Sequence, residues 1–406
     1  MNFTRKIARL LLLNRHYFPV AQLFLSLSLM FGTWIVYLPS ITEKLGMDEG
    51  QLGVALLSAA IGSLISTWIG NKLSKKIGEG KLALLGVLGM TLFIFSYFLA
   101  TSFLQLSLLM FLFGLTSGIM QIGLNTVVTT IEQRDNIAIM SSCHAWFSLG
   151  GMLSAGFGTV LMIMLNNPLL HIGIAAAIVL LMQLLSYPKF LSLNQSIELE
   201  REMKTAPRIK NPRLWALAVV AVTAMVSEGA IADWSGLYLR DVTMAPAAQL
   251  GLGYAGFSMM MTLGRFCGDY FSTRLGPWQI LLNGFLVSLI GLLFVFTGST
   301  WAALSGFALV GAGFSILVPE AYRLSTKIAG VSPSSGIAFM AGAGYIGFLG
   351  GPVLIGTIAN HADLRAGFLF VLFLILIGLV AAFILKLRHI NSPWLNVILL
   401  RIKKSV

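Results

Sequence analysis

Two carboxylates, Glu228 and Asp233, stand inside a hydrophobic stretch that runs from about 214 to 240. An ionised carboxylate at the centre of a bilayer costs at least ~2.5 kcal/mol, so such residues normally face a polar interior. A carboxyl group in that setting can hold a proton until water or a basic partner arrives, which is the chemistry of proton coupling. The sequence makes Glu228 a candidate proton-coupling residue, and an acid that hydrogen-bonds between helices is the alternative.

Asp233 and His144 are candidates for assisting roles in the same proton coupling. Asp233 follows Glu228 by five residues, which separates the two by about 140° around a helix, so they are expected to do different jobs. Asp233 lies nearer the far interface and could be a second relay acid, a substrate contact or an outer gate. His144 lies about one turn into an apolar stretch that begins near 138. A histidine there can titrate near neutral pH, bind substrate or simply pack at a helix end.

Other polar or aromatic side chains inside apolar stretches are candidates for lining a substrate cavity. Gln121 and Asn125 are four residues apart and share a helix face. Such amides either bind a polar solute or join helices through hydrogen bonds, which average only about 0.6 kcal/mol in membranes. The full set of cavity candidates is Gln22, Ser26, Thr33, Trp34, Gln121, Asn125, Trp234 and Tyr345.

The elements that must position these residues are membrane-spanning helices. The chain has 406 residues, of which 57% are hydrophobic and 10% charged, and its mean hydropathy is +0.87. Apolar runs of ~20 residues are long enough to cross a bilayer as helices. We expect twelve spans, near 17–39, 49–71, 81–100, 103–129, 138–165, 168–188, 213–240, 248–273, 277–298, 300–322, 333–360 and 364–387.

The longest polar connection divides these spans into two halves of six. The expected organisation is an N-tail at 1–16, an N-terminal half at 17–188, a linker at 189–212, a C-terminal half at 213–388 and a C-tail at 389–406. With both termini inside, the outer connections hold only Lys44, Arg240 and Arg365, while most other basic residues fall on inner segments or tails. The positive-inside rule therefore predicts cytoplasmic termini.

Composition also excludes several classes of function. The net charge of +12 sits in short loops and tails and not on a soluble basic domain, so we expect no nucleic-acid partner. We interpret Cys143 and Cys267 as small packing residues. The consecutive methionines at 259–261 point in different directions around a helix, so they cannot all bind one ion. No metal site or cofactor is therefore expected. A phosphate-binding loop with lysine is absent, and no nucleophile motif accompanies the acids, so neither direct ATP use nor an enzyme is predicted.

A weak internal repeat favours a transporter. The turn at 70–78, after the second span, and the turn at 264–276, after the eighth, both place glycines and basic residues at a short inner connection. Paired halves of this kind are typical of secondary transporters, which bind solute between the repeats near the middle of the membrane.

Three motifs carry a more specific resemblance. They are Ser-Ser-Cys-His-Ala-Trp-Phe-Ser-Leu-Gly-Gly at 141–151, Glu-Gly-Ala-Ile-Ala-Asp-Trp-Ser at 228–235 and Gly-Tyr-Ile-Gly-Phe-Leu-Gly-Gly-Pro at 344–352. With the repeated turns, they make almost the whole chain resemble the major facilitator superfamily, in a largely uncharacterised bacterial branch related to the fucose/proton symporters. The resemblance implies the all-α fold of twelve transmembrane helices in two pseudo-symmetric halves, and a monomer.

The resemblance also implies a set of gating residues. Asp269 and Arg265 match the acid and base that latch the inner gate in this superfamily, with Arg274 nearby, while Ser74 stands where the N-terminal turn usually has an acid. Glu320 and Arg323, three apart, can pair with each other on a helix, either as a latch that breaks during transport or as a static ion pair.

The function that we expect is secondary active transport by alternating access. Few charges besides Glu228 and Asp233 remain in the expected cavity, so the solute is expected to be a small, polar, neutral or cationic organic molecule, moved with protons across a bacterial inner membrane. The alternatives are a proton-driven exporter of drugs or metabolites and a membrane sensor of the same fold that does not transport.

Overall fold

The protein is a bundle of long helices. The computed structural model describes residues 17–135, 139–190, 211–325, 327–328, 331 and 333–390, and the predicted N-tail, most of the linker and most of the C-tail lie outside these ranges. Within them no strand occurs. The helices are α2 Phe18–Leu45, α3 Glu49–Ile77, α4 Glu79–Tyr97, α5 Phe103–Asp135, α6 Met140–Leu165, α7 Pro168–Phe190, α8 Pro212–Asp241, η2 Ala247–Gln249, α9 Leu252–Leu275, α10 Pro277–Val295, α11 Thr300–Phe314, α12 Leu317–Ser325, α13 Pro333–His361 and α14 Leu364–Ile390.

Ten stretches among the described residues are long and apolar enough to cross a membrane. The helices α9 and α13, in the positions predicted for the eighth and eleventh spans, are not among the ten. The inner part of α9 carries Arg265, Asp269 and Arg274, which lower its hydropathy.

The first helix is longer than its apolar core predicts. The sequence suggests an end near 39, but α2 continues past Pro39 to Leu45. It ends at Gly46, whose φ of 61° is left-handed, and the backbone N–H groups of Gly46 and Met47 close the last turn. Glycine adopts this conformation without the steric penalty that a Cβ atom brings, so the chain can turn sharply into α3.

The predicted tenth span is two helices instead of one. The helix α11 ends at Phe314 and α12 begins at Leu317. Pro319 has no backbone N–H to donate to the carbonyl of Ser315. It lies in the first turn of α12, where the missing N–H costs no hydrogen bond within the helix. The Ser315 hydroxyl bonds the carbonyl of Ala312 at 2.7 Å beside the break.

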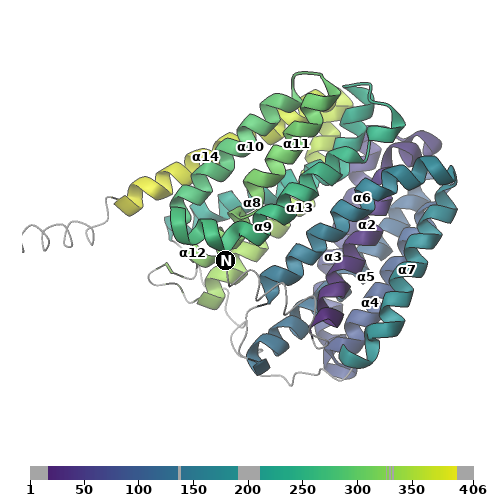
Figure 1. The fold of residues 1–406 in the computed structure, drawn as a ribbon, viewed down its shortest axis with the longest axis horizontal. Helices are drawn as coiled ribbons and strands as arrows, with labels where there is room; N and C mark the ends of the chain where they lie inside the picture. The colour runs from purple at the N-terminus through teal and green to yellow at the C-terminus, as the bar shows by residue number, and fades with distance from the viewer. Residues whose placement is uncertain are drawn as a thin grey trace, which may run out of the picture.

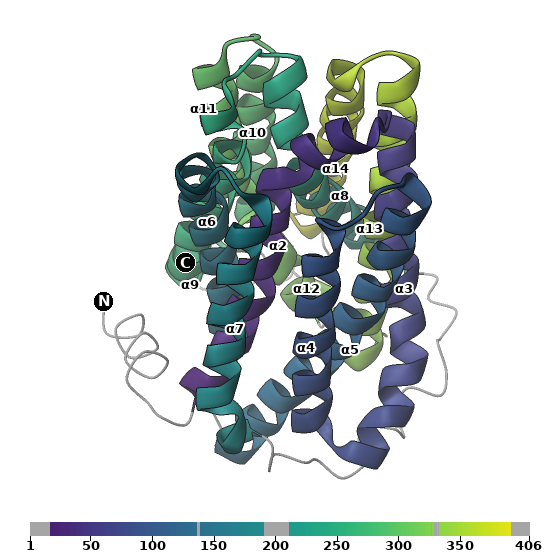
Figure 2. The same cartoon turned by 90° about the vertical axis from the view of Figure 1, so that its right-hand side faces the viewer.

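The helices form two groups, α2–α7 and α8–α14, whose ribbons lie close together at one end and diverge toward the other (Figure 1). The groups pack together most extensively through α6 with α9 and α3 with α13, and each pair lies side by side in Figure 2. We call the end with the α2–α3 and α8–α9 connections the outer end, and the end with the α3–α4 turn at Gly78 the inner end, following the predicted orientation.

Contacts between the groups are closest near the outer end, in what we call the outer seam. A Cβ atom added to Gly356 of α13 would lie 2.5 Å from the Glu49 carbonyl oxygen and 3.0 Å from the Gly53 Cα atom of α3. A Cβ atom at Gly236 of α8 would lie 3.4 Å from the Pro39 ring of α2. Glycines let the backbones approach this closely, so the two groups are packed together at this end.

Arg240 adds a polar contact to the outer seam. Its Nη1 atom donates to the Pro39 carbonyl at 2.7 Å, while Asp241 accepts from its Nε and Nη2 atoms at 2.5 and 2.9 Å. The hydrogen bond therefore links α8 of one group to α2 of the other.

We expect Arg240→Gln to weaken closure of the outer seam. Because the charge-assisted bond is partly exposed, its loss should reduce the free energy of closing the outer seam by about 1 kcal/mol. This corresponds to roughly a fivefold change in the ratio of closed to open forms. Labelling of an introduced cysteine between the groups by an impermeant thiol reagent from the outer side measures that balance. Arg134→Gln is the matched control, because Arg134 pairs with its own neighbour Asp135 at 2.8 Å; an equal effect of both substitutions would contradict the assignment.

Candidate functional site

Glu228 lies in a cluster that joins the two groups of helices. Its Oε1 atom is 3.9 Å from Nη2 of Arg265, which α9 carries, and Nη1 of Arg265 donates to the hydroxyl of Ser148 on α6 at 2.6 Å. The side chains of Glu228 and Arg265 are 32% and 13% exposed. The carboxylate thus has a basic partner and is also in contact with solvent.

His144 lies beside this cluster. It precedes Ser148 by one helical turn, and the Ser148 hydroxyl also approaches the His144 carbonyl at 3.4 Å. The charge of Arg265 acts on the imidazole, and the ring meets Phe24 of α2 edge to face with centroids 5.2 Å apart. The side chain is exposed. The structure therefore brings His144 within electrostatic range of the Glu228–Arg265 pair.

Asp233 is in a different environment from Glu228. Its side chain is only 8% exposed, and among the described residues no hydrogen bond or ion pair reaches its carboxylate. Glu228 and Asp233 both lie close enough to Tyr254 of α9 to interact with it electrostatically. The different environments agree with the expectation that the two acids have different roles.

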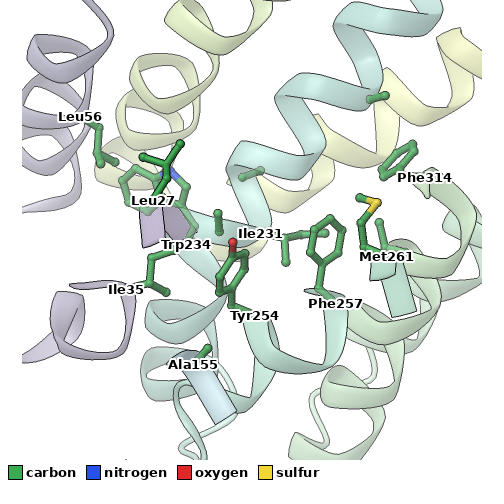
Figure 3. Close-up of a cluster of buried hydrophobic side chains, with 14 of the residues drawn as sticks. Leu27, Ile35, Leu56, Ala155, Ile231, Trp234, Tyr254, Phe257, Met261 and Phe314 are labelled. Atoms are coloured by element: carbon green, nitrogen blue, oxygen red, sulfur yellow. The ribbon is translucent and has the colours of Figure 1, made fainter. Parts of the chain in front are cut away.

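Tyr254 is a residue that the sequence did not single out. A Cβ atom on Gly151 of α6 would lie 2.8 Å from the Tyr254 hydroxyl, 3.0 Å from the Ser28 hydroxyl and 3.2 Å from the Ser258 hydroxyl. Three hydroxyls from α2 and α9 therefore surround one glycine. In Figure 3 the Tyr254 hydroxyl points toward the part of α8 that carries Ile231 and Trp234. Its only signal in the sequence is a phenol inside an apolar span.

Four of the predicted cavity residues are buried in the N-terminal group. Gln22, Ser26, Thr33 and Trp34 are each 2% exposed or less. The Gln183 amide of α7 donates to the Ser26 hydroxyl at 3.0 Å and exchanges 3.4 Å bonds with the Gln22 amide. Trp34 packs edge to face on Tyr97 with centroids 4.7 Å apart. Gln22 and Ser26 thus bond between helices, whereas the Thr33 hydroxyl donates to the Leu29 carbonyl of its own helix at 2.8 Å. Cavity lining by these residues stays a prediction.

We expect Gln183→Leu to destabilise the protein. It leaves the buried NH2 group of Gln22 without its acceptor on Gln183, which costs about 1–3 kcal/mol, whereas the double variant Gln22→Leu/Gln183→Leu removes both partners and is nearly neutral. Thermal unfolding of the purified variants in detergent measures the difference. A double variant less stable than Gln183→Leu would contradict a role confined to joining α2 and α7.

The other cavity candidates have varied surroundings. Gln121 and Asn125 on α5 are partly exposed, as lining residues would be. Trp234 is fully buried, its Nε1 atom lacks a hydrogen-bond partner among the described residues, and it lies with Leu27 and Leu56 of the other group (Figure 3). The Tyr345 side chain lies outside the described part of the structure.

Among the expected gating residues, Arg265 contacts Ser148 and Glu228. The Asp269 side chain lies outside the described part of the structure, so its expected pairing with Arg265 stays a prediction. Arg274 stacks on the Tyr270 ring at 5.0 Å.

Glu320 and Arg323 pair within the C-terminal group. Their closest atoms are 3.5 Å apart, and Ser272 of α9 bonds both, donating to Glu320 at 2.9 Å and accepting from Arg323 at 2.6 Å. All three belong to the same group of helices, an arrangement that suits a static pair.

The described residues contain no group of three or more His, Cys, Asp or Glu side chains that could hold a metal ion. The candidate site consists of one ion pair, Glu228–Arg265, whose arginine also bonds Ser148 of the other group, one buried carboxylate and several hydroxyls.

Comparison with known proteins identifies the family. The family model of the Major Facilitator Superfamily matches residues 21–319. The chain belongs to the major facilitator superfamily. An uncharacterized MFS-type transporter of Yersinia pestis is 30% identical over 340 residues, 83% of this chain and 87% of the relative. The membrane protein MosC of Rhizobium meliloti is 28% identical over 366 residues, 89% of this chain and 88% of the relative.

Solved structures show the same superfamily fold. The nucleoside transporter NupG covers 93% of this chain and 99% of its own at a TM-score of 0.71 with 15% identity. A bacterial homologue of the human lysosomal transporter Spinster, in an inward-facing and unoccupied conformation, covers 92% of this chain and 97% of its own, with a TM-score of 0.68 and 15% identity. The protein is thus an MFS transporter with the all-α, twelve-span membrane fold that its sequence predicts.

Proposed function

We propose that this MFS transporter is a proton-coupled secondary transporter of a small, polar, neutral or cationic organic solute. The observation that carries the proposal is the contact of Glu228 with Arg265, whose guanidinium is bonded to Ser148 in the other group of helices. A titratable carboxylate is thereby linked to a contact between the two halves that must separate and rejoin during transport.

The proposed mechanism begins at the Glu228 carboxylate. When it is ionised it balances the Arg265 guanidinium, and that guanidinium can hold Ser148 of the N-terminal group. When Glu228 takes up a proton, Arg265 loses its counter-charge and the free energy of the contact between groups changes. Only such a difference in interaction between two states lets a bound proton shift their equilibrium.

The arrangement of the two groups suits alternating access. The outer seam packs α3 on α13 and α2 on α8, while Glu228 keeps 32% of its side chain exposed and His144 is exposed. A closed outer seam with an exposed Glu228 is what a conformation open to the inner side requires. In it, a proton and solute taken up outside would be released inside.

The remaining parts of the proposal follow from charge placement and family. The protein would lie in a bacterial inner membrane with both termini in the cytoplasm, act as a monomer and leave its solute chemically unchanged. An imposed membrane potential would add ~2.3 kcal/mol per 100 mV for each net charge moved inward.

Proteoliposomes test the proposed function directly. Purified protein is reconstituted with a pH-sensitive dye inside, and solutes from a panel of sugars, amines, vitamins and nucleosides are added outside. A coupled solute acidifies the lumen, and it accumulates when the outside is made acidic. If accumulation of every transported solute is independent of the pH gradient, proton coupling is wrong.

A further inference from the structure

Asp233 is the one acid in the candidate site that has no partner in the described structure. It is 8% exposed. The arginines of α8 and α9 described above bond elsewhere: Arg265 contacts Ser148 and Glu228, and Arg240 contacts Pro39 and Asp241. A buried carboxylate without a counter-charge is costly, because desolvation of the charge is not offset. It therefore requires a proton or a cation supplied from outside the protein.

The direction in which Asp233 points follows from its neighbours on the same face of α8. Three residues outward, Gly236 contacts Pro39, and a further turn outward Arg240 bonds the same proline. Four residues inward, a Cβ atom on Gly229 would meet nothing within 4 Å. This face of α8 is thus turned toward the N-terminal group, and Asp233 lies where the closed outer seam gives way to open space.

Glu228 occupies another face of the same helix. It pairs with Arg265 of α9, and Ser235, seven residues further along, packs against Gly253 of α9. Residues seven apart lie on one face, so this face of α8 is turned toward its own group. Proton coupling therefore already has a carboxylate with a basic partner, and Asp233 is left facing the space between the groups.

Hydroxyl acceptors lie on helices that neighbour α8, and the Tyr254 hydroxyl points toward Ile231 and Trp234, on the segment of α8 that carries Asp233 (Figure 3). The Ser28 hydroxyl of α2 is buried and has no hydrogen-bond partner among the described residues, although buried polar groups are nearly always paired. It lies beside the Tyr254 hydroxyl at Gly151, and the Asp233 charge acts on that phenol. A carboxylate with nearby hydroxyl acceptors suits a group that presents several N–H donors on a positive charge.

We propose that Asp233 binds the positively charged group of the transported solute, so that the substrate is a small organic cation with an ammonium or amidinium group. The proposal rests on the proposed transport function and narrows its substrate class. Binding of the cation neutralises Asp233 at the boundary of the outer seam, where a charge without a partner would otherwise be buried when the seam closes.

The test uses the full-length protein purified in detergent, with probes paired by shape and differing in charge. Choline is set against 3,3-dimethyl-1-butanol, cyclohexylamine against cyclohexanol, and agmatine against a neutral diol of equal length, with sodium chloride as the inorganic cation. At pH 7.5 we expect at least one organic cation to raise the Tm while its neutral partner does not. Asp233→Asn should weaken that cation's apparent affinity roughly 30-fold or more.

Asp363→Asn is the matched control, because Asp363 accepts a hydrogen bond from the backbone of Ala366 at 2.8 Å at the exposed start of α14, and asparagine can replace it there. This control should leave the cation's affinity unchanged. Without ligand, Asp233→Asn should not lower the Tm, because no partner in the fold is lost. Four outcomes overturn the proposal: a lower Tm of unliganded Asp233→Asn, equal binding of the neutral partners, stabilisation by sodium chloride alone, or no response to any of the cations.

Flux in proteoliposomes separates this inference from the proposed function. If a cation binds through Asp233 but its uptake ignores the pH gradient, the cation site stands and proton coupling fails. If the solute that moves with protons is neutral and is unaffected by Asp233→Asn, proton coupling stands and the cation site is wrong.

Discussion

Replacing Glu228 with glutamine is expected to abolish gradient-driven accumulation of solute while leaving exchange of labelled for unlabelled solute intact. Glutamine keeps the shape of the side chain but cannot take up or release a proton. A gradient of one pH unit is worth ~1.4 kcal/mol, which supports a concentration ratio of about ten for one proton per solute. In Glu228→Gln that ratio should fall to about one, measured in proteoliposomes with labelled solute.

Exchange should survive because it requires the loaded protein to change conformation without net proton movement. Asp48→Asn is the matched control: Asp48 is an exposed carboxylate that caps α3 by accepting from the backbone of Gln51 at 2.6 Å, and asparagine caps equally well. If Glu228→Gln accumulates solute as well as the unaltered protein does, Glu228 does not carry the proton. If both accumulation and exchange are lost in a folded variant, Glu228 is needed for binding or movement and not for coupling alone.

Substitution of Gly356 by valine is expected to hold the outer seam open. A Cβ atom there would lie 2.5 Å from the Glu49 carbonyl oxygen and 3.2 Å from the Trp234 ring. The clash with the Glu49 backbone can be relieved only if α3 and α13 move apart. Overpacking of this kind costs about 1–3 kcal/mol. Because only the closed seam has the clash, the balance of states should shift by about fivefold to more than a hundredfold toward the form open outward.

Cysteine labelling measures this shift. Cys143 and Cys267 are first replaced by serine, and a single cysteine is placed at Gly229, which has open space around it. With Gly356→Val, an impermeant thiol reagent should label this cysteine faster from the outer side and more slowly from the inner side. Gly342→Val on the same helix is the control, because a Cβ atom at Gly342 meets nothing within 4 Å. An unchanged ratio in Gly356→Val would mean that the seam does not close against this glycine during transport.

Helix order was readable from the sequence because lipid imposes a simple rule. Every backbone polar group inside the hydrocarbon must be bonded within its own segment, so each apolar run of sufficient length forms a helix. The starts of α5 at 103, α10 at 277 and α14 at 364 follow from this rule. The extension of α2 past Pro39 and the break before Pro319 depend on helix-end chemistry that hydropathy alone does not register.

The sequence by itself determined the family, the membrane-spanning helices and the two carboxylates as the residues most worth study. The tertiary structure decided which side chains meet. Gln22 bonds Gln183, 161 residues away, and Arg265 contacts Glu228 and Ser148. The reason is that lipid is as apolar as the helix interior. Hydrophobicity then says little about which face of a helix turns inward, and only the packing of its neighbours settles that rotation.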